Sequence, residues 1–378
     1  MKVLINASII GDELNGLGVY SVEVIKRLLP LLDSSNIDFD VYCYKKKFVN
    51  FLPDEKVSLI RLRRFDNFFL KISPSLHRII WNKFTLKRLI KNYDLVYSPS
   101  SHGCTGAANQ IVTVHDLICL TYPRQNIFQY LYYRFFLKSI LKKSLVVAIS
   151  NYTKNEIYKH FSFKEEKFPI QTIYNGADHL IKDKSQKHGD TNVVLEKFGL
   201  TSKKFFLAVG ATYPHKNILR LIEAAREFES TNYTFVIVGG GGYLRSIRDK
   251  VSELSLTNVI LLTRLSNAEL AILYNECLIN VYISLLEGFG FPPIEAAFYN
   301  TISVVANSSC LPEVYGDAAI YVDPTNTQDI VTTFNKIIDG KIRVEDFTSK
   351  LLGLSQKYKW DFTVERIFQI ISSNILLK

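Results

Sequence analysis

The sequence predicts an α/β protein with two doubly wound, Rossmann-like domains that face a cleft. At 378 residues the chain is too long for one ordinary core. Short apolar runs typical of strands alternate with helical patterns, which favours mostly parallel sheets. The alternation stops at the polar stretch IKDKSQKHGDTN (Ile181–Asn192) and then restarts. We therefore expect a first domain over 1–185, a second over 186–357, and an apolar helix over 358–378.

The first half opens with a strand (Lys2–Ala7), a glycine-bearing loop (Gly11–Gly18) and a helix whose apolar residues recur at helical spacing from Val19 to Leu29. The later strand-like runs are FDVYCY, VSLIRL, DLVYS, QIVTVHD and SLVVAIS. The second half repeats this rhythm with FFLAVG, TFVIV, NVILL, INVYIS and TISVVANS. Helical patterns over 218–228, from Tyr243 onward and over 268–276 separate several of these strands.

The composition restricts the possible partners. A net charge of +10 favours anionic partners, such as phosphorylated metabolites, nucleic acid or an acidic lipid surface. The five cysteines are odd in number and scattered, which indicates buried reduced thiols rather than a disulfide or zinc framework. We expect the opening MKVLINASIIG to form a first strand rather than a cleavable leader, because no small-residue cleavage pattern follows it. No apolar run of about 18 residues occurs in the sequence, so we expect no transmembrane helix.

Ligands of doubly wound sheets bind beyond the carboxyl ends of the strands, so the loops there are the candidate sites. Gly16 and Gly18 lie between the first strand and the first helix, where bare amides can approach a phosphate. An ordinary tight turn would use the same glycines. The pair Asp38 and Asp40 has the spacing of a metal-binding Asp-x-Asp, but it leads directly into a strand and is predicted to begin that strand.

The stretch SLLEGFGFPPIEA (Ser284–Ala296) follows the predicted strand INVYIS. Glu287 should lie just past the end of that strand, and the next glycines leave their amides uncovered. We expect a helix to start near Pro293, with Pro292 at the cap and Glu295 in the first turn. Such a loop offers amides for phosphates and carboxylates for hydroxyls, although the two glutamates could instead only cap local structure.

A second loop, VGATYPHKN (Val209–Asn217), places Lys216 at the start of a helix, where an ammonium could meet the same phosphates. A solvated lysine is the alternative. Phosphates and many hydroxyls together describe a nucleotide sugar.

These residues resemble a known family. SLLEGFGFPPIEA and LPEVYGDAAIYVDP (Leu311–Pro324) resemble the donor-binding signature of retaining glycosyltransferases of family 4, which have the GT-B fold. VGATYPHKN resembles their phosphate loop. VHDL (Val114–Leu117) resembles the His-Asp-Leu motif of the branch that contains bacterial mannosyltransferases of surface-polysaccharide assembly. The similarity covers nearly the whole chain, and it implies that the final helix crosses back onto the first domain.

The resemblance implies roles for individual residues. Glu287 would contact hydroxyls of the donor sugar, Glu295 the nucleotide ribose and Lys216 the diphosphate, while His115 and Asp116 would lie near the reacting centre. The catalytic set is then His115, Asp116, Glu287 and Lys216. The implied donor-binding set is Gly16, Gly18, Lys216, Arg264, Glu287, Gly288, Phe289, Gly290 and Glu295.

The chain departs from the family pattern at four positions. Ala211 stands where an arginine is common, His215 replaces the arginine beside Lys216, and Asn300 and Ile302 replace a usual glycine and proline. Arg264 could compensate for the lost charge. The implied reaction retains the anomeric configuration, needs no metal or other cofactor, and uses the nucleotide diphosphate sugar as co-substrate.

Two segments are rich in basic and aromatic residues: Arg61–Lys91 and Tyr130–Lys143. They are candidates for contact with an anionic membrane surface, and ordinary amphipathic helices are the alternative. No nucleic-acid motif accompanies them, so we expect no nucleic-acid partner. The resemblance, with its lipid-linked acceptors, implies a cytoplasmic protein held peripherally at the inner face of the cell membrane.

The predicted function is therefore transfer of a sugar, with GDP-mannose as the leading donor, to a lipid-linked glycan in surface-polysaccharide or O-antigen synthesis. Other donors, such as dTDP-rhamnose, UDP-glucose or UDP-N-acetylglucosamine, stay open. A nucleotide-sugar epimerase and a non-catalytic nucleotide-sugar-binding subunit are the rival functions.

Overall fold

The computed structural model describes residues 2–11, 16–44, 56–60, 73–180 and 191–376. The chain divides into two compact units. The first comprises Met1–Gly176 together with Trp360–Lys378, and the second comprises Ala177–Lys359. The sequence analysis had drawn the boundaries after residues 185 and 357.

In the first unit the described residues form a seven-stranded parallel sheet in the order β3-β2-β1-β4-β5-β6-β7. The strands β4 and β5 are buried on both faces, as expected of a parallel sheet covered by helices. The strands are β1 (Lys2–Asn6), β2 (Asp38–Cys43), β3 (Val57–Leu59), β4 (Leu95–Ser98), β5 (Gln110–Val114), β6 (Leu145–Ala148) and β7 (Ile170–Thr172).

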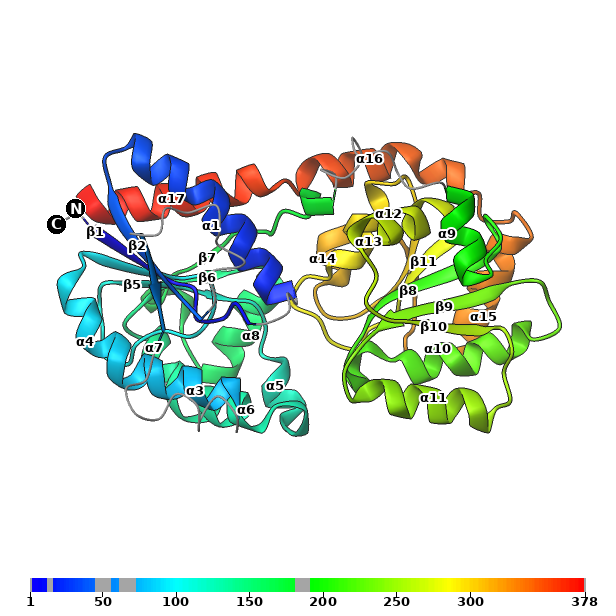
Figure 1. Ribbon diagram of the computed structural model, residues 1–378, viewed down its shortest axis with the longest axis horizontal. Coiled ribbons are helices and arrows are strands. Elements are labelled where there is room, and N and C mark those ends of the chain that lie inside the picture. Colours follow the sequence, from blue (N-terminus) through cyan, green and yellow to red (C-terminus); the bar gives the residue numbers. More distant parts are fainter. Residues whose placement is uncertain (1, 12–15, 45–55, 61–72, 181–190, 377–378) are drawn as a thin grey trace. The chain divides into compact units, whose positions relative to one another are not determined.

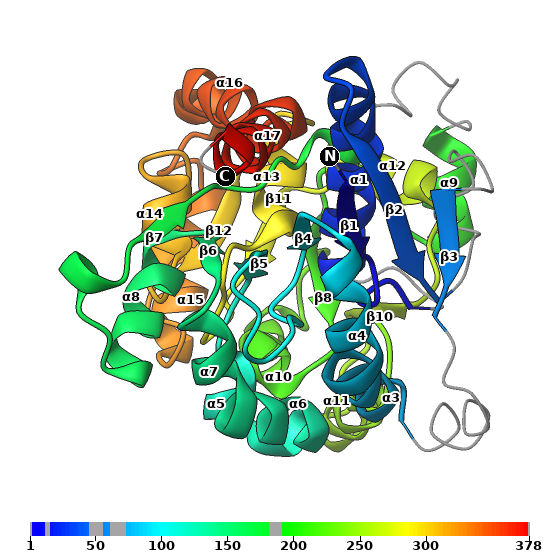
Figure 2. The ribbon, with the colours of Figure 1, turned by 90° about the vertical axis from the view of Figure 1, so that its left-hand side faces the viewer.

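Helices cover both faces of this sheet, with α1 and α17 over one face and α3, α4, α6 and α7 over the other (Figures 1 and 2). The α-helices are α1 (Gly16–Ser34), α3 (Pro74–Ile80), α4 (Lys87–Leu89), α5 (Ile118–Thr121), α6 (Ile127–Tyr132), α7 (Lys138–Leu141), α8 (Asn151–Phe161) and α17 (Trp360–Leu376). Two π-helical segments, η3 (Trp81–Leu86) and η6 (Tyr133–Leu137), continue α3 and α6. The 3₁₀ turns are η4 (Ile90–Asn92), η5 (Pro123–Gln125) and η7 (Glu165–Lys167).

The final helix α17 belongs to the first unit, because it packs along α1. The Arg27 guanidinium on α1 donates to Asp361 over 3.1 Å, and the fully buried Trp360 packs edge-on against Tyr20. The return of the last helix to the first unit, which the family resemblance implied, is therefore present.

The second unit contains a six-stranded parallel sheet in the order β10-β9-β8-β11-β12-β13. Its strands are β8 (Phe205–Ala211), β9 (Thr234–Gly239), β10 (Val259–Leu262), β11 (Ile279–Tyr282), β12 (Ser303–Ala306) and β13 (Ile320–Val322). Its helices are α9 (Thr191–Phe198), α10 (Ile218–Ala225), α11 (Tyr243–Glu253), α12 (Asn267–Glu276), α13 (Phe291–Ala297), α14 (Leu311–Tyr315), α15 (Thr327–Ile338) and α16 (Thr348–Lys357). The 3₁₀ turns are η9 (Pro214–Lys216), η10 (Arg226–Phe228) and η11 (Val344–Phe347).

An apolar core fills the space between this sheet and the helices α9, α12 and α13, which lie on one of its faces (Figure 1). Phe205 and Leu207 of β8 are fully buried there beside Leu273 and Tyr274 of α12. This packing fixes α13 close to the end of β11, and the loop between them carries Glu287.

The two-sheet α/β prediction is confirmed, and the strands that were expected from the sequence are present where the structure describes them. Asp38 begins β2, as predicted, and lies at the amino end of the sheet with Lys2 and Lys56 as ion-pair partners. The five cysteines are free, and all but the half-buried Cys119 are buried. No helix among the described residues is long and apolar enough to span a bilayer.

Candidate active site

The second unit brings Lys216 and Glu287 together. Strands β8 and β11 are parallel neighbours, so the loops that follow them leave the same edge of the sheet. The Leu285 amide donates to the His215 carbonyl over 2.8 Å and ties the two loops to each other. The Lys216 Nζ then donates to Glu287 Oε1 over 2.6 Å.

Tyr282 completes this pair from the last position of β11. Its hydroxyl donates to Glu287 Oε1 over 2.8 Å and accepts from the Lys216 Nζ over 3.0 Å. Both donors meet Oε1, whereas Oε2 of Glu287 accepts no hydrogen bond from the described part of the chain. The carboxylate is therefore held in place by one oxygen, and the other oxygen can accept from a hydroxyl of a ligand.

Glu287 is only 6% exposed. Burial by itself raises the pKa of this carboxyl, but the charge of Lys216, the charge of His215 at the acidic pH where its ring is protonated, and the two hydrogen bonds outweigh burial and bring the pKa below its ordinary value. Burial also lowers the pKa of the neighbouring His215 to about 4, so its imidazole is neutral near pH 7. Lys216 is therefore the cation of this cluster at neutral pH.

The glycine loop after Glu287 is held in a conformation that other residues avoid. Gly290 has a φ of 86°, and a Cβ built there would lie 2.7 Å from the Tyr315 hydroxyl. That hydroxyl in turn donates to the Gly290 carbonyl, and the Ser309 hydroxyl accepts from the Glu287 amide over 3.1 Å. The amides of Phe289 and Gly290 donate to no acceptor among the described residues, so they can serve a ligand.

The helix after this loop starts earlier than predicted. α13 begins at Phe291, with Gly290 rather than Pro292 at the cap, and Glu295 lies beyond its first turn. Both prolines are tolerated early in the helix because the amides of those positions have no intrahelical acceptor. Because neither proline has an N–H group, the glycine loop is the main source of free amides at this end of α13.

Glu295 lies in a separate buried cluster. The Tyr274 hydroxyl donates to its Oε2 over 2.8 Å, and the His179 Nε2 lies 3.3 Å from its Oε1. Both oxygens therefore have protein partners. Its predicted contact with a ribose stays a prediction.

The positions of Lys216 and Arg264 in the fold complete the account of the second unit. Lys216 does not start α10, because it ends the short turn η9 and Asn217 separates it from the helix. Arg264 follows the edge strand β10, is exposed, and makes no ion pair or hydrogen bond with the described residues. Its role in donor binding stays a prediction.

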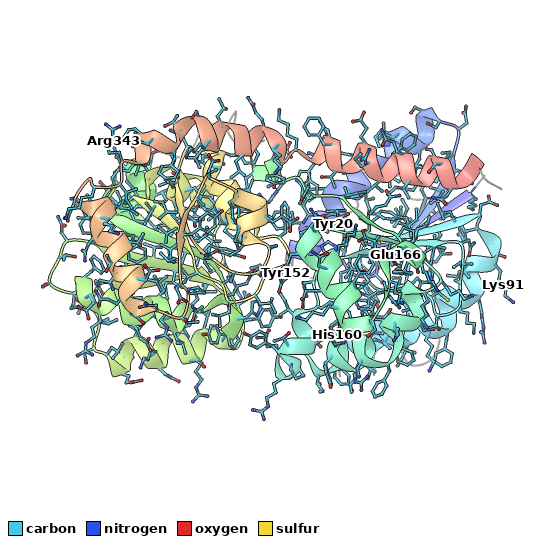
Figure 3. The ribbon with its side chains drawn as sticks, turned by 180° about the vertical axis from the view of Figure 1, so that it is seen from behind. Tyr20, Lys91, Tyr152, His160, Glu166 and Arg343 are labelled. Atoms are coloured by element: carbon cyan, nitrogen blue, oxygen red, sulfur yellow. The ribbon has the colours of Figure 1, made fainter. Side chains whose placement is uncertain are left out.

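In the first unit, His115 follows β5 at the carboxyl edge of the sheet. Its Nε2 lies 2.9 Å from the Pro99 carbonyl, and Tyr20, labelled in Figure 3, packs edge-on against its ring. Burial lowers the pKa of His115 to about 4. The neutral ring must carry its proton on Nε2 to donate to Pro99, so Nδ1 is left as an acceptor.

The other predicted residues of this unit have local structural roles. Asp116 is half-buried, and its Oδ1 accepts from the Ile118 amide over 2.9 Å. Gly16 and Gly18 were expected in a loop, which is wrong, because α1 begins at Gly16 and both glycines lie in its first turn. Much of the predicted loop, residues 12–15, lies outside the described residues.

Sequence reasoning missed Tyr282, Tyr274 and Tyr315, which hold the two glutamates and Gly290. Each is buried and lies within a strand or helix, where an aromatic residue usually indicates core packing. No signal in the sequence marked Tyr274 or Tyr315, whereas Tyr282 stands at the end of its strand, next to the ligand edge. Across the described ranges, no three His, Cys, Asp or Glu side chains gather as a metal centre would require.

Comparisons with known proteins agree with this architecture. Residues 15–179 match the model for Glycosyltransferase Family 4, and residues 193–350 match the model for Glycosyl transferases group 1. The O-antigen chain mannosyltransferase RfbU of Salmonella typhimurium is 29% identical over 92% of this chain and 95% of its own length. O-antigen chain mannosyltransferase B of Escherichia coli is 23% identical over 96% of this chain and 97% of its own length.

The solved structures give the same fold. HepE of Anabaena, solved in complex with UDP and glucose, superposes with a TM-score of 0.71 at 18% identity over 99% of this chain and all of its own (100%). The two parallel sheets and the two family matches define a glycosyltransferase with the GT-B fold. The first half of the chain thus matches glycosyltransferases of Family 4, and the second half matches those of group 1.

Proposed function

We propose that the chain is a retaining, metal-independent mannosyltransferase that moves mannose from GDP-mannose to a lipid-linked glycan in O-antigen synthesis. The two relatives that align along nearly their whole length are both O-antigen chain mannosyltransferases. The observation that carries the proposal is the Lys216–Tyr282–Glu287 cluster, which combines a cation for phosphate with a carboxylate oxygen that accepts from no donor among the described residues.

In this proposal Lys216 and the amides of Phe289 and Gly290 bind the diphosphate of the donor. They stabilise the negative charge that grows on the leaving phosphate as the glycosidic bond breaks. Oε2 of Glu287 accepts from a hydroxyl of the sugar, and the Lys216 contact holds that carboxylate ionised. The leaving phosphate takes the proton of the acceptor hydroxyl, so the mechanism uses no separate protein base, metal or cofactor.

The first unit supplies His115. The Nδ1 atom of its neutral ring can accept a hydrogen bond from a hydroxyl, while the hydrogen bond from Nε2 to the Pro99 carbonyl fixes the orientation of the ring. Asp116 orients the following turn, and Gly16 and Gly18 are proposed to lie beside the donor. Glu295 is proposed to bind the ribose, with Tyr274 and His179 holding the carboxylate in place.

A panel of nucleotide sugars tests the donor. GDP-mannose at 100 times its Kd should stabilise the protein by about 2.7 kcal/mol against thermal unfolding. UDP-glucose, UDP-N-acetylglucosamine and dTDP-rhamnose at the same concentration should protect it less. Equal or greater protection by one of these would move the donor assignment to that sugar, and conversion of donor alone to an isomer would favour an epimerase.

Variants test catalysis. Glu287→Gln and Lys216→Met should each lower transfer to a lipid-linked acceptor by at least a hundredfold, the scale for losing a group that stabilises transition-state charge. Lys336→Met, an exposed lysine of the same unit, is the matched control and should leave transfer unchanged. Unchanged transfer in both site variants would contradict the catalytic proposal, whereas full transfer in EDTA and an unchanged anomeric configuration would support its metal-independent, retaining form.

We also propose peripheral binding to an anionic membrane surface. Phe84 on η3 and Phe135 on η6 are 57% and 68% exposed, and Ile127 and Leu131 on α6 are 50% and 39% exposed. Exposed basic residues lie on or beside the same helical segments at Lys83, Lys87, Arg88, Lys91, Arg134, Lys138, Lys142 and Lys143. Basic charge attracts anionic lipid and aromatic side chains enter the interface. The segment 61–72 of the predicted surface lies outside the described residues.

Flotation with phosphatidylglycerol vesicles tests this surface. The double variant Phe84→Ser, Phe135→Ser should lose most of its vesicle binding, since each buried aromatic contributes about 1.5–3 kcal/mol. Phe362→Ser, a control at a residue of α17 that is 55% exposed, should keep it. If the double variant floats with the vesicles as well as the control does, the proposed membrane surface is wrong.

A further inference from the structure

Arg78 is a buried cation that has no carboxylate partner among the described residues. It lies on α3, is 9% exposed, and its Nε donates to the Ser8 carbonyl over 2.9 Å. Its two Nη nitrogens make no hydrogen bond or ion pair with the residues that the structure describes. A buried charge of this kind is unfavourable unless a counter-charge joins it.

Three titratable neighbours of the guanidinium in the described part of the chain are electrically neutral. Burial and the nearby charge of Arg78 lower the pKa of His102 well below its ordinary value, so this imidazole is uncharged. Burial raises the pKa of Tyr132 and of Tyr133 above the ordinary range, so both hydroxyls keep their protons. These three groups cannot balance the positive charge.

Ser8 gives a second, independent sign of a missing ligand. Its side chain is fully buried, and its hydroxyl has no hydrogen-bond partner in the described part of the chain. Ser8 follows β1 and His102 follows β4, so the unpaired hydroxyl and the guanidinium lie at the carboxyl edge of the first sheet. His115, whose charge also affects the pKa of His102, follows β5 at this edge.

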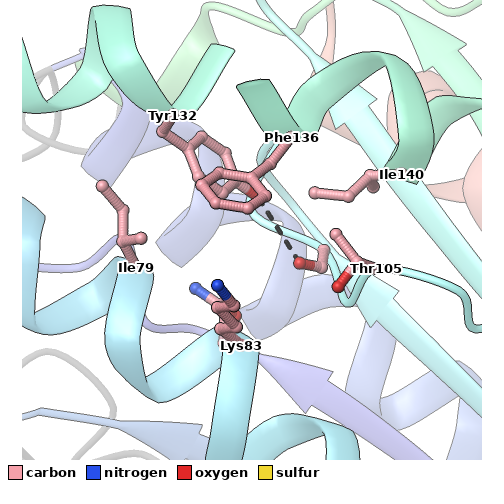
Figure 4. Close-up of a pocket in the computed structure, with 8 residues that line it drawn as sticks. Ile79, Lys83, Thr105, Tyr132, Phe136 and Ile140 are labelled. Atoms are coloured by element: carbon pink, nitrogen blue, oxygen red, sulfur yellow. Dashed lines mark hydrogen bonds between the residues drawn. The ribbon is translucent and has the colours of Figure 1, made fainter. Parts of the chain in front are cut away.

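An apolar pocket adjoins this place. Its walls come from α3 and η3 on one side and from α6, η6 and α7 on the other (Figure 4). Tyr132 and Asn82 line the pocket, and the Asn82 amide donates to the Arg78 carbonyl over 2.9 Å. The Lys83 Nζ lies 4.9 Å from the ring centre of Phe136 in the pocket wall. The exposed aromatics Phe84 and Phe135 project from the same two helical segments.

We propose that Arg78 and Ser8 bind a phosphate of the lipid carrier to which the acceptor glycan is attached. A guanidinium matches two phosphate oxygens in a fork, and a serine hydroxyl can donate to a third. The inference rests on the proposed function, which supplies a lipid-linked acceptor. It assigns a second anion site, on the first unit, besides the donor diphosphate site on the second.

Titration calorimetry with geranyl diphosphate, a soluble isoprenoid diphosphate, tests the site in the full chain. The Lys216→Met background removes the cation of the donor site, so the remaining affinity reports the first unit. In that background Arg78→Met should weaken binding at least tenfold, Ser8→Ala should weaken it several-fold, and Arg78→Lys should fall between them. Arg366→Met, an exposed arginine of α17, is the matched control and should bind like its parent.

Stability without ligand gives the second readout. Arg78→Met also removes the hydrogen bond to the Ser8 carbonyl, so the Tm of the ligand-free protein should fall relative to Arg366→Met. Because Arg78 has no carboxylate partner among the described residues, this fall should be the same at pH 7 and at pH 4. A fall that shrinks as pH is lowered toward 4 would show that the guanidinium pairs with a carboxylate of the chain itself, and would overturn the proposal. Binding of geranyl diphosphate that is unchanged by Arg78→Met would also overturn it.

A vesicle arm separates the two sources of phosphate. Binding to phosphatidylglycerol vesicles should depend on Phe84 and Phe135 and not on Arg78. If vesicle binding depends on Arg78 and geranyl diphosphate binding does not, the site binds a membrane headgroup and the acceptor assignment is refuted. The donor is measured separately, on the native protein. If GDP-mannose does not protect the native protein while Arg78→Met still weakens geranyl diphosphate binding, the proposed donor is wrong and the proposed anion site is supported.

Discussion

Replacing Lys216 with methionine should destabilise the second unit as well as stop sugar transfer. The side chains of Lys216 and Glu287 are 17% and 7% exposed, so their ion pair is buried. The variant leaves the Glu287 carboxylate with one remaining side-chain donor, the Tyr282 hydroxyl. Removing one partner of a buried pair costs about 3–5 kcal/mol. For a unit of this size, that cost lowers the Tm by roughly 10 °C.

The pH dependence of this loss identifies its cause. In the native protein the pKa of Glu287 is lowered, so the pair contributes stability above the ordinary carboxyl pKa of 4.5 and loses it as pH falls through the lower native pKa. In the Lys216→Met variant less opposes the effect of burial, so the pKa of Glu287 rises. Protonation of Glu287 then removes its unpaired buried charge and restores part of the stability of the variant. The difference in Tm between variant and native protein should therefore shrink as pH falls from about 7 to 5.

Calorimetry across this pH range is the assay, and the double variant Lys216→Met, Glu287→Gln is its control. Removing the carboxylate charge as well should restore most of the lost stability, whereas transfer should remain absent. A Lys216→Met protein that melts within about 2 °C of the native protein at pH 7 would refute the buried pair. A double variant that regains transfer would refute its catalytic role.

Three further predictions concern single groups. NMR spectra of isotope-labelled histidine should show that His115 titrates near pH 4 and that its neutral ring carries the proton on Nε2. Because this pKa lies below the ordinary 6.5, the ring contributes stability above pH 6.5 that is lost as pH falls toward 4. A titration midpoint near 6.5 would contradict the burial of the ring. Gly290→Ala should lower the free energy of unfolding more than Gly340→Ala, since both have positive φ but only the first Cβ meets other atoms, and equal losses would remove the packing argument. Tyr274→Phe should cost about 1.5–3 kcal/mol in urea unfolding, because it removes a hydrogen bond to the buried carboxylate of Glu295, and a loss below about 0.5 kcal/mol would show that this bond is not formed in solution.

Most of the fold could be predicted because the local sequence pattern indicates each strand and helix. Apolar runs such as QIVTV and INVY are short and continuous, as in strands buried on both faces, and helical spacing marks the segments between them. The starting residue of α13 was harder to predict, because two adjacent prolines are compatible with a helix that begins before them or at the second of them. The packing of Gly290 against Tyr315 decides the starting residue.

The sequence by itself determined that Glu287 follows a buried strand and that Lys216 lies in a loop after another strand. It could not determine that the two meet, because this depends on β11 pairing with β8 rather than with a strand nearer in the chain. The same holds for Arg78 and Ser8, which are 70 positions apart and unremarkable in sequence. Only the tertiary structure shows that Arg78 is buried without a counter-charge among the described residues, since burial and charge balance are properties of neighbours that the fold brings together.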